Sequence, residues 1–289
     1  MLIFQLIRLR QWSKNLIIYV VMFASNEISQ ENIVTLIILF FGFSLIVSSS
    51  YIFNDIVDKD SDINHPTKKM RPIASGKISE NIAKFVMVFL FIIGHVIIFN
   101  LNVQLLVFTS IYIAFTSLYT TKLKYIKYVD LINITSLFLV RLILGGVALN
   151  IDISVFLYFF VFFSSLGIVS AKKYSILKSD QIFDSSSKVK SFLNQNYKDI
   201  ELKNIMDWSF LLSCITYLLW IFIDKISAIN FYGILLLLFS LISYMFFIYF
   251  FRKDTIQAKT EEIVEVIFTN KNILFSLIFF GLSFFIGGL

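Results

Sequence analysis

The sequence predicts an all-α integral membrane protein of about nine transmembrane helices, on the evidence of its composition and hydropathy. Of the 289 residues, 58% are hydrophobic and only 15% are charged, and the mean hydropathy is +0.83. A soluble domain is typically about a quarter charged and less than half apolar. Apolar stretches recur along the chain, and helices bond every backbone group internally within a bilayer. Residues 1–289 are therefore expected to form a single transmembrane domain.

The predicted spans are the apolar stretches between polar breaks. A helix that crosses the hydrocarbon core needs about 20 apolar residues. The first stretch is the weakest, because only residues 16–24 are continuously apolar. The nine stretches lie near residues 14–28, 32–54, 80–100, 103–121, 128–149, 152–171, 205–223, 228–251 and 271–288. The single cysteine, Cys214, lies in an apolar stretch, which excludes a disulfide framework and a cysteine-based metal site.

Charge alternates between the loops and predicts the orientation. Of the 25 Lys and Arg residues, 23 fall on one side of the predicted spans, whereas the opposite loops hold only Lys225. By the positive-inside rule the basic side is cytoplasmic. We therefore expect a multi-pass protein of the inner or plasma membrane with a cytoplasmic N-terminus. The same asymmetry accounts for the net charge of +6 without a nucleic-acid partner.

The most charged part of the chain follows the second span, where residues 54–76 read NDIVDKDSDINHPTKKMRPIASG. If the helix continues past Phe53, its polar residues recur at i, i+4 and i+8 and share one face. Carboxylates on one face repel one another unless a cation lies between them, and oxygen ligands of this kind suit Mg²⁺. The predicted magnesium ligands are Asn54, Asp58 and Asp62, with Asp55 at the edge of the face.

Basic residues follow these acids directly. Lys68, Lys69 and Arg71 can bind anions, so acids for a metal beside cations for phosphate predict a diphosphate site on the cytoplasmic side. A solvated, basic cytoplasmic loop is the alternative, but such a loop has no need of four aspartates. That alternative explains Lys59, Lys77 and Lys84 equally well. His65 is interpreted as a loop or capping residue, since no second histidine is near in the sequence.

The run Asn54-Asp-x-x-Asp58-x-x-x-Asp62 resembles the first aspartate-rich motif of the UbiA superfamily of intramembrane polyprenyl transferases. The longer form, His65-Pro-x-Lys-x-x-Arg71-Pro-Ile-Ala-x-Gly76, resembles the branch of decaprenyl-phosphate phosphoribosyltransferases. Other segments resemble this branch in order along the chain. They are Arg8-Leu-Arg-Gln-Trp12-Ser-Lys14-Asn15, with Leu9 in place of a proline, Tyr119-Thr-Thr-Lys122-Leu-Lys124, Val129-Asp130, and Arg141 with Gly145.

A second acidic motif, usual in family members that use prenyl diphosphates, is replaced here by basic residues. Where it should stand, at the end of the sixth span, the chain has Lys172 and Lys173. The phosphoribosyl branch typically reads Lys-Arg-x-x-Glu, and Ile176 stands in place of the glutamate. Asp180 and Asp184, a little further on, lie in a stretch rich in Ser and Lys, and their binding of metal is left open.

The resemblance implies about nine helices around a cytoplasm-facing cavity in a single transferase domain. It also implies Mg²⁺-dependent transfer of 5-phosphoribose from phosphoribosyl diphosphate to a polyprenyl phosphate. The donor carries a 5-phosphate in addition to its diphosphate, and this group needs cations rather than a second acidic cluster. An arginine in the middle of a span is a functional hypothesis by default, so Arg141 is expected to bind substrate phosphate. The structural alternative for Arg141 is a buried pair with Asp130 or another acid.

These expectations define a set of site residues, and two alternative functions remain open beside the phosphoribosyl transfer. The catalytic residues are Asp55, Asp58, Asp62 and Arg141, and the substrate-binding residues are Lys14, Asn15, Lys68, Arg71, Tyr119, Lys122, Lys124, Asp130, Lys172 and Lys173. The nearer alternative is a prenyl transferase of the same fold that acts on an aromatic or quinone precursor. The further alternative is a carrier for an anionic lipid, which would need no metal-binding acids. The pathway served, the chain length of the lipid and the oligomeric state are left open.

Overall fold

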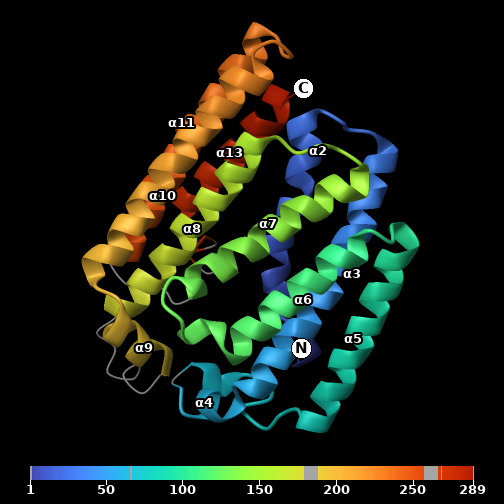
Figure 1. The fold of residues 1–289 in the computed structure, drawn as a ribbon, viewed down its shortest axis with the longest axis vertical. Coiled ribbons are helices and arrows are strands. Elements are labelled where there is room, and N and C mark those ends of the chain that lie inside the picture. Colours follow the sequence, from blue (N-terminus) through green and yellow to red (C-terminus); the bar gives the residue numbers. More distant parts are fainter. Residues whose placement is uncertain (1, 66, 179–187, 257–265, 268, 289) are drawn as a thin grey trace. The chain divides into compact units, whose positions relative to one another are not determined.

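The computed structural model describes residues 2–65, 67–178, 188–256, 266–267 and 269–288, and within these residues every regular element is a helix (Figure 1). Six helices are long and apolar enough to cross a membrane. They are α3 (Gln30–Val57), α5 (Glu80–Leu101), α7 (Val129–Leu149), α8 (Val155–Lys178), α10 (Asp199–Leu219) with the π-helix η5 (Trp220–Lys225), and α11 (Phe231–Ile256). Two shorter apolar helices are α6 (Leu105–Thr121) and α13 (Lys271–Gly288). The all-helical fold is thus confirmed, but a count of nine spans is not.

The first predicted span, residues 14–28, differs most from expectation. The chain begins with α1 (Leu2–Leu6) and then forms an 11-residue 3₁₀-helix, η1 (Leu9–Tyr19), before the short α2 (Val20–Ser25). Runs of 3₁₀-helix longer than three or four residues are uncommon. This segment is therefore shaped by its neighbours rather than by local preference.

The described chain divides into two compact units. Of the described residues, the first unit contains those within 2–19, 29–150 and 188–196, and the second contains those within 20–28, 151–178 and 197–288. Short elements complete the first unit: α4 (Lys59–Ile63), η2 (Lys68–Met70), η3 (Leu123–Tyr125) and α9 (Lys188–Asn196).

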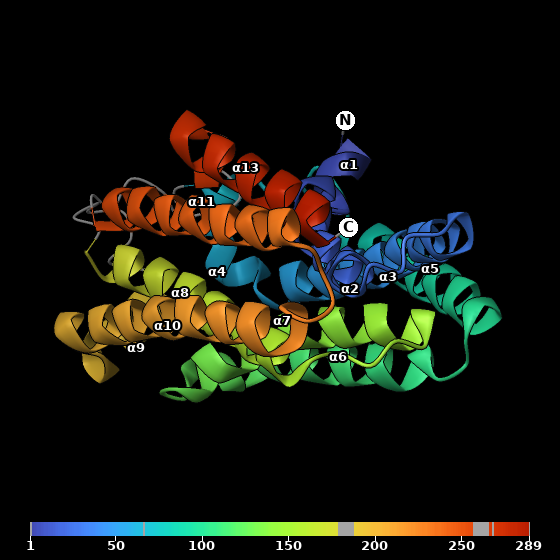
Figure 2. The same cartoon turned by 90° about the horizontal axis from the view of Figure 1, so that it is seen from above.

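In the first unit, α3 and α5 lie side by side along their lengths (Figures 1 and 2). Ser29 and Ser79 cap the N-termini of these helices by accepting a hydrogen bond from the backbone N–H three residues on. The helices approach closely at two glycines, because a Cβ on Gly94 would lie 2.8 Å from the carbonyl oxygen of Gly42. Small residues of this kind replace the hydrophobic driving force between helices in a bilayer. This packing fixes the direction in which the C-terminal end of α3 points.

The second unit packs α8 against α10 and α11 against α13 around an aromatic core. The rings of Phe160, Tyr217 and Tyr244 have centroids 5.0–5.3 Å apart where they meet. The two tyrosine hydroxyls bond to serines on neighbouring helices, at Ser240 for Tyr217 and at Ser213 for Tyr244. Burying a tyrosine in this way requires a partner for its hydroxyl.

Candidate metal and phosphate site

The acidic segment lies at the junction of α3 and α4. α3 ends at Val57, Asp58 has φ −88° and ψ 4°, and α4 begins at Lys59. Backbone bonds from Asp58 N–H to the Asn54 carbonyl and from Asp62 N–H to the Asp58 carbonyl, both 2.9 Å, keep a four-residue spacing across the junction. The polar side chains of this segment nevertheless have different partners and form two pairs.

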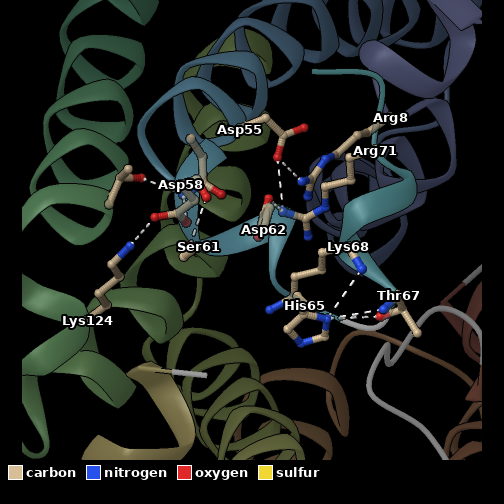
Figure 3. Close-up of polar contacts among 12 residues, drawn as sticks. Arg8, Asp55, Asp58, Ser61, Asp62, His65, Thr67, Lys68, Arg71 and Lys124 are labelled. Carbon is tan, nitrogen blue, oxygen red and sulfur yellow. Dashed lines mark hydrogen bonds and ion pairs between the residues drawn. The ribbon is translucent and has the colours of Figure 1, made fainter. Parts of the chain in front are cut away.

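The first pair consists of Asp55 and Asp62, which share a single arginine (Figure 3). Arg71 Nη1 lies 3.2 Å from Asp55 Oδ1 and 2.6 Å from Asp62 Oδ2. Arg8 also forms an ion pair with Asp55 Oδ1. The carboxylates are buried, with side-chain exposures of 2% for Asp55 and 5% for Asp62. Burial of two carboxylates is tolerated here because cations neutralise them.

The second pair consists of Asn54 and Asp58. The Asn54 amide donates to Asp58 Oδ2 at 2.9 Å and to the Thr120 hydroxyl at 3.3 Å. The Lys124 ammonium lies 2.5 Å from Asp58 Oδ1. Asp62 thus meets Asp55 and Arg71, while Asp58 meets Asn54 and Lys124. The expected common face of Asn54, Asp58 and Asp62 stays a prediction.

The loop between α4 and α5 fixes Arg71 by its own backbone bonds. The buried His65 ring nitrogen Nδ1 accepts from the backbone N–H groups of Thr67 and Lys68, both at 3.3 Å. This confirms His65 as a loop residue. Arg71 N–H bonds to the Lys68 carbonyl and Ser75 N–H bonds to the Arg71 carbonyl, both at 2.9 Å. The backbone of Arg71 is thus held from both sides, and only its side chain is left to rotate.

Arg8 is a site residue that the sequence analysis did not select. Its φ of +50° is uncommon for a residue with a side chain. Its guanidinium pairs with Asp55 and lies 5.0 Å from the ring centroid of Tyr51, one helical turn before Asp55 on α3. The available signal was its place at the head of the segment Arg8–Asn15, which resembles the phosphoribosyl branch.

The 3₁₀-helix η1 explains how Arg8 reaches the acidic segment. The Trp12 indole donates to the Ser48 hydroxyl and the Asn15 amide donates to the Ser44 hydroxyl, both at 2.9 Å. Three residues of 3₁₀-helix rise about 6 Å, as do four residues of α-helix, so a period of three on η1 matches a period of four on α3. The two helices therefore run antiparallel in register, and the residue preceding η1 arrives near the C-terminal turn of α3.

Arg141 lies in the interior of the first unit, only 3% exposed. It donates to Asn15 Oδ1 at 2.9 Å, to the Leu137 carbonyl at 2.6 Å and to the Tyr112 hydroxyl at 3.0 Å. Its described partners are thus neutral oxygens, together with the faces of neighbouring aromatic rings. None of these bonds of Arg141 involves Asp130, whose carboxylate accepts from the Leu131 N–H at 2.9 Å. Binding of substrate phosphate by Arg141 stays a prediction.

The other predicted residues are distributed over both units. In the first unit, Lys14, Lys68 and Tyr119 are half-buried and Lys122 is exposed. In the second unit, Lys172 is exposed and Lys173 is buried, both on α8. Asp180 and Asp184 lie outside the described residues. The structure thus brings together Asn54, Asp55, Asp58, Asp62, Arg71 and Lys124, and adds Arg8.

Within the part of the chain that the structure describes, no three His, Cys, Asp or Glu side chains form a group that could hold a metal ion. Two carboxylates suffice for Mg²⁺, which usually takes one or two of them and completes its shell with substrate phosphates. Asp55 and Asp62 already direct an oxygen each at one cationic nitrogen of Arg71. This pair therefore fits Mg²⁺ in its donor atoms and in its convergence on a positive charge.

Comparison with known proteins adds an independent line of evidence. The model of the UbiA prenyltransferase family matches residues 15–287. A decaprenyl-phosphate phosphoribosyltransferase of Mycolicibacterium smegmatis is 31% identical over 75% of this chain and 69% of that protein. One of Mycobacterium tuberculosis is 33% identical over 59% of this chain and 58% of that protein. The structure of a UbiA homolog from Archaeoglobus fulgidus, bound to GPP and Mg²⁺, is similar with a TM-score of 0.68 at 16% identity, covering 99% of both chains.

Proposed function

Because the chain belongs to the UbiA prenyltransferase family, we propose that it transfers 5-phosphoribose from phosphoribosyl diphosphate to a polyprenyl phosphate and releases diphosphate. Relatives that are 31% and 33% identical carry the name of this activity, which supports the choice of donor and acceptor. The transferase would be a multi-pass membrane protein, with this site on the cytoplasmic side of the inner or plasma membrane.

The observation that carries the proposal is the meeting of carboxylates and cations at the end of α3. We call Arg8, Asp55, Asp58, Asp62, Arg71 and Lys124 the ion-pair cluster. Its carboxylates are suited to a metal ion and its guanidinium and ammonium groups to phosphate oxygens, so one place offers both halves of a metal–diphosphate site.

In the proposed reaction, an oxygen of the lipid phosphate forms a bond to C1 of the ribose as the bond from C1 to the diphosphate oxygen breaks. Attack from the face opposite the diphosphate inverts C1. The lipid phosphate is already anionic at neutral pH, so it needs no general base. Arg8, Arg71 and Lys124 would hold the diphosphate in line with its departure. Mg²⁺ held by Asp55 and Asp62, with Asn54 and Asp58 beside them, would supply positive charge against the leaving group.

A second candidate is favoured by the similar folds. The homolog from Archaeoglobus fulgidus is bound to GPP and Mg²⁺, so a prenyl diphosphate is the donor to test against phosphoribosyl diphosphate. The acceptor in that case would be an aromatic or quinone precursor.

The decisive experiment supplies both donors to detergent-purified protein with Mg²⁺. One reaction contains labelled phosphoribosyl diphosphate and a polyprenyl phosphate, and the other contains a labelled prenyl diphosphate and 4-hydroxybenzoate. We expect a labelled lipid from the first reaction only, and its loss when a chelator is added. Label in the prenylated aromatic compound alone would overturn the proposed donor.

A further inference from the structure

The ion-pair cluster contains as many cations as carboxylates. Arg8 and Arg71 neutralise Asp55 and Asp62, and Lys124 neutralises Asp58. The cations come from three separate segments: the turn before η1, the loop after η2, and η3. The cluster is therefore neutral as a whole, and each carboxylate already has a positively charged partner.

Burial shows which groups a ligand would meet first. The side chains of Arg8 and Arg71 are 17% and 21% exposed, whereas those of Asp55 and Asp62 are 2% and 5% exposed. The arginines are thus more exposed than the two carboxylates with which they pair. The order is reversed at the other pair, where Asp58 is 22% exposed and Lys124 is 10% exposed. Asp58 is thus the most exposed carboxylate of the cluster, whereas at the other pair a ligand meets Arg8 and Arg71 before Asp55 and Asp62.

Each ligand alone would bind at a cost. A divalent cation that took Asp55 and Asp62 would leave two guanidinium groups without carboxylates and beside a further positive charge. A diphosphate that took Arg8 and Arg71 would leave two buried carboxylates unpaired. When both ligands bind, the carboxylates exchange arginine for metal and the arginines exchange carboxylate for phosphate. Every charge then keeps a partner.

The backbone allows such an exchange without rearrangement. Arg8 N–H bonds to the Gln5 carbonyl at 3.2 Å, and Gln11 N–H bonds to the Arg8 carbonyl at 2.8 Å. Arg71 is held similarly through Lys68 and Ser75. Both arginines therefore have fixed backbones and long side chains, so rotation about side-chain bonds is sufficient to change their partners.

We propose that Arg8 and Arg71 are exchangeable counter-ions that make the binding of a divalent metal and of diphosphate mutually dependent, and that Arg8 is a diphosphate-binding residue. This inference rests on the proposed function for the presence of a diphosphate, but not for the identity of the group attached to it. Reciprocal coupling of this kind is a property of binding free energies and can be measured without turnover.

The experiment measures Mn²⁺ binding by electron paramagnetic resonance, on detergent-purified full-length protein with and without inorganic pyrophosphate. Formation of the Mn²⁺–pyrophosphate complex in solution is measured separately and subtracted. We expect pyrophosphate to tighten Mn²⁺ binding of the wild type by about 5- to 150-fold, the usual range of such couplings. In Arg8→Gln, Mn²⁺ alone should bind more tightly than to the wild type, and pyrophosphate should tighten it much less.

The matched control is Lys84→Gln. Lys84 pairs with Glu80 at 2.7 Å on the same unit, and both side chains are exposed. The substitution removes one positive charge, as Arg8→Gln does, and should leave both Mn²⁺ affinities at the wild-type values. Arg8→Lys should keep part of the coupling, because it keeps the charge but loses the forked guanidinium.

The inference is overturned if Arg8→Gln weakens binding of Mn²⁺ alone or leaves the pyrophosphate effect unchanged. Should Arg8→Gln fail to fold, Arg71→Gln makes the same test, since Arg71 contacts both carboxylates. Pyrophosphate carries neither ribose nor a prenyl chain. Coupling together with a failed transfer assay would therefore reject only the proposed donor, and transfer without coupling would reject only this inference.

Discussion

Arg71 and Asp62 should contribute unequally to stability, although they are partners in one ion pair. Asp62 Oδ2 is bonded to Arg71 Nη1 at 2.6 Å, and Arg71 is the cation paired with Asp62. Arg71 also contacts Asp55 at 3.2 Å. Arg71→Gln leaves the buried Asp62 without a counter-ion, whereas Asp62→Asn leaves Arg71 with Asp55. Only Arg71→Gln therefore leaves a buried charge without a counter-ion.

The magnitudes follow from this difference. Removing one partner of a buried pair costs roughly 3–5 kcal/mol, and Arg71 is partly exposed, so Arg71→Gln should cost about 3 kcal/mol. Asp62→Asn removes one charged hydrogen bond and should cost about 1.5 kcal/mol. In the double variant position 62 is a neutral asparagine, so no carboxylate is left without a counter-ion there. Its loss of unfolding free energy should therefore be less than the sum of the two single losses and no greater than that of Arg71→Gln alone.

Equilibrium unfolding in mixed detergent micelles, applied to the wild type, both single variants and the double variant, measures the pairwise coupling. The pair Lys84 and Glu80 is the control, and its coupling should be much smaller because both side chains reach solvent. A cost for Asp62→Asn that equals or exceeds that of Arg71→Gln would refute the reasoning, as would costs that simply add.

Substitutions at three further positions, one of them with a control, test other parts of the protein. Asp58→Asn should abolish turnover, because it removes the most exposed carboxylate of the ion-pair cluster; wild-type turnover would remove Asp58 from the metal site. Gly145→Ala should destabilise by about 3 kcal/mol, because its Cβ would lie 2.2 Å from the backbone carbonyl of Ile18. Gly281→Ala, with no atom within 4 Å of its Cβ, is the control and should not lower stability. Arg141→Ala should abolish turnover and Arg141→Lys should retain part of it, since an ammonium cannot reproduce the guanidinium bonds to three oxygens; full turnover in either would exclude a functional role.

Hydropathy located most helices correctly and failed at the N-terminus for a physical reason. The apolar stretches near residues 32–54 and 80–100 correspond to α3 and α5 in the structure. A long apolar segment can be recognised from its own composition and length. Residues 14–28 have weaker apolar character, and Trp12, Asn15 and Ile18 recur at a spacing of three residues at the start of this segment and just before it. That spacing is favourable only against the serines of α3 and Gly145 of α7, which are distant in the sequence.

The residue types of the site could be predicted from the sequence, because magnesium requires oxygen ligands and phosphate requires cations wherever these groups lie. The acidic run and Arg71 were selected on that ground, and Lys124 was selected from the resemblance of its segment. In the structure Arg71 pairs with Asp62, and Lys124 pairs with Asp58. The membrane orientation and the roles of Lys172 and Lys173 stay predictions.

Which charge meets which was decided only by tertiary structure. α3 ends just before Asp58 and α4 begins just after it. Asp58 pairs with Lys124, whereas Asp62, four residues on, pairs with Arg71. Arg8 is 47 residues from Asp55 in the chain and reaches it because η1 runs in register with α3. The sequence determines which residue types can pair with one another. The distance between them is set by the packing of helices, which cannot be predicted from a local sequence pattern.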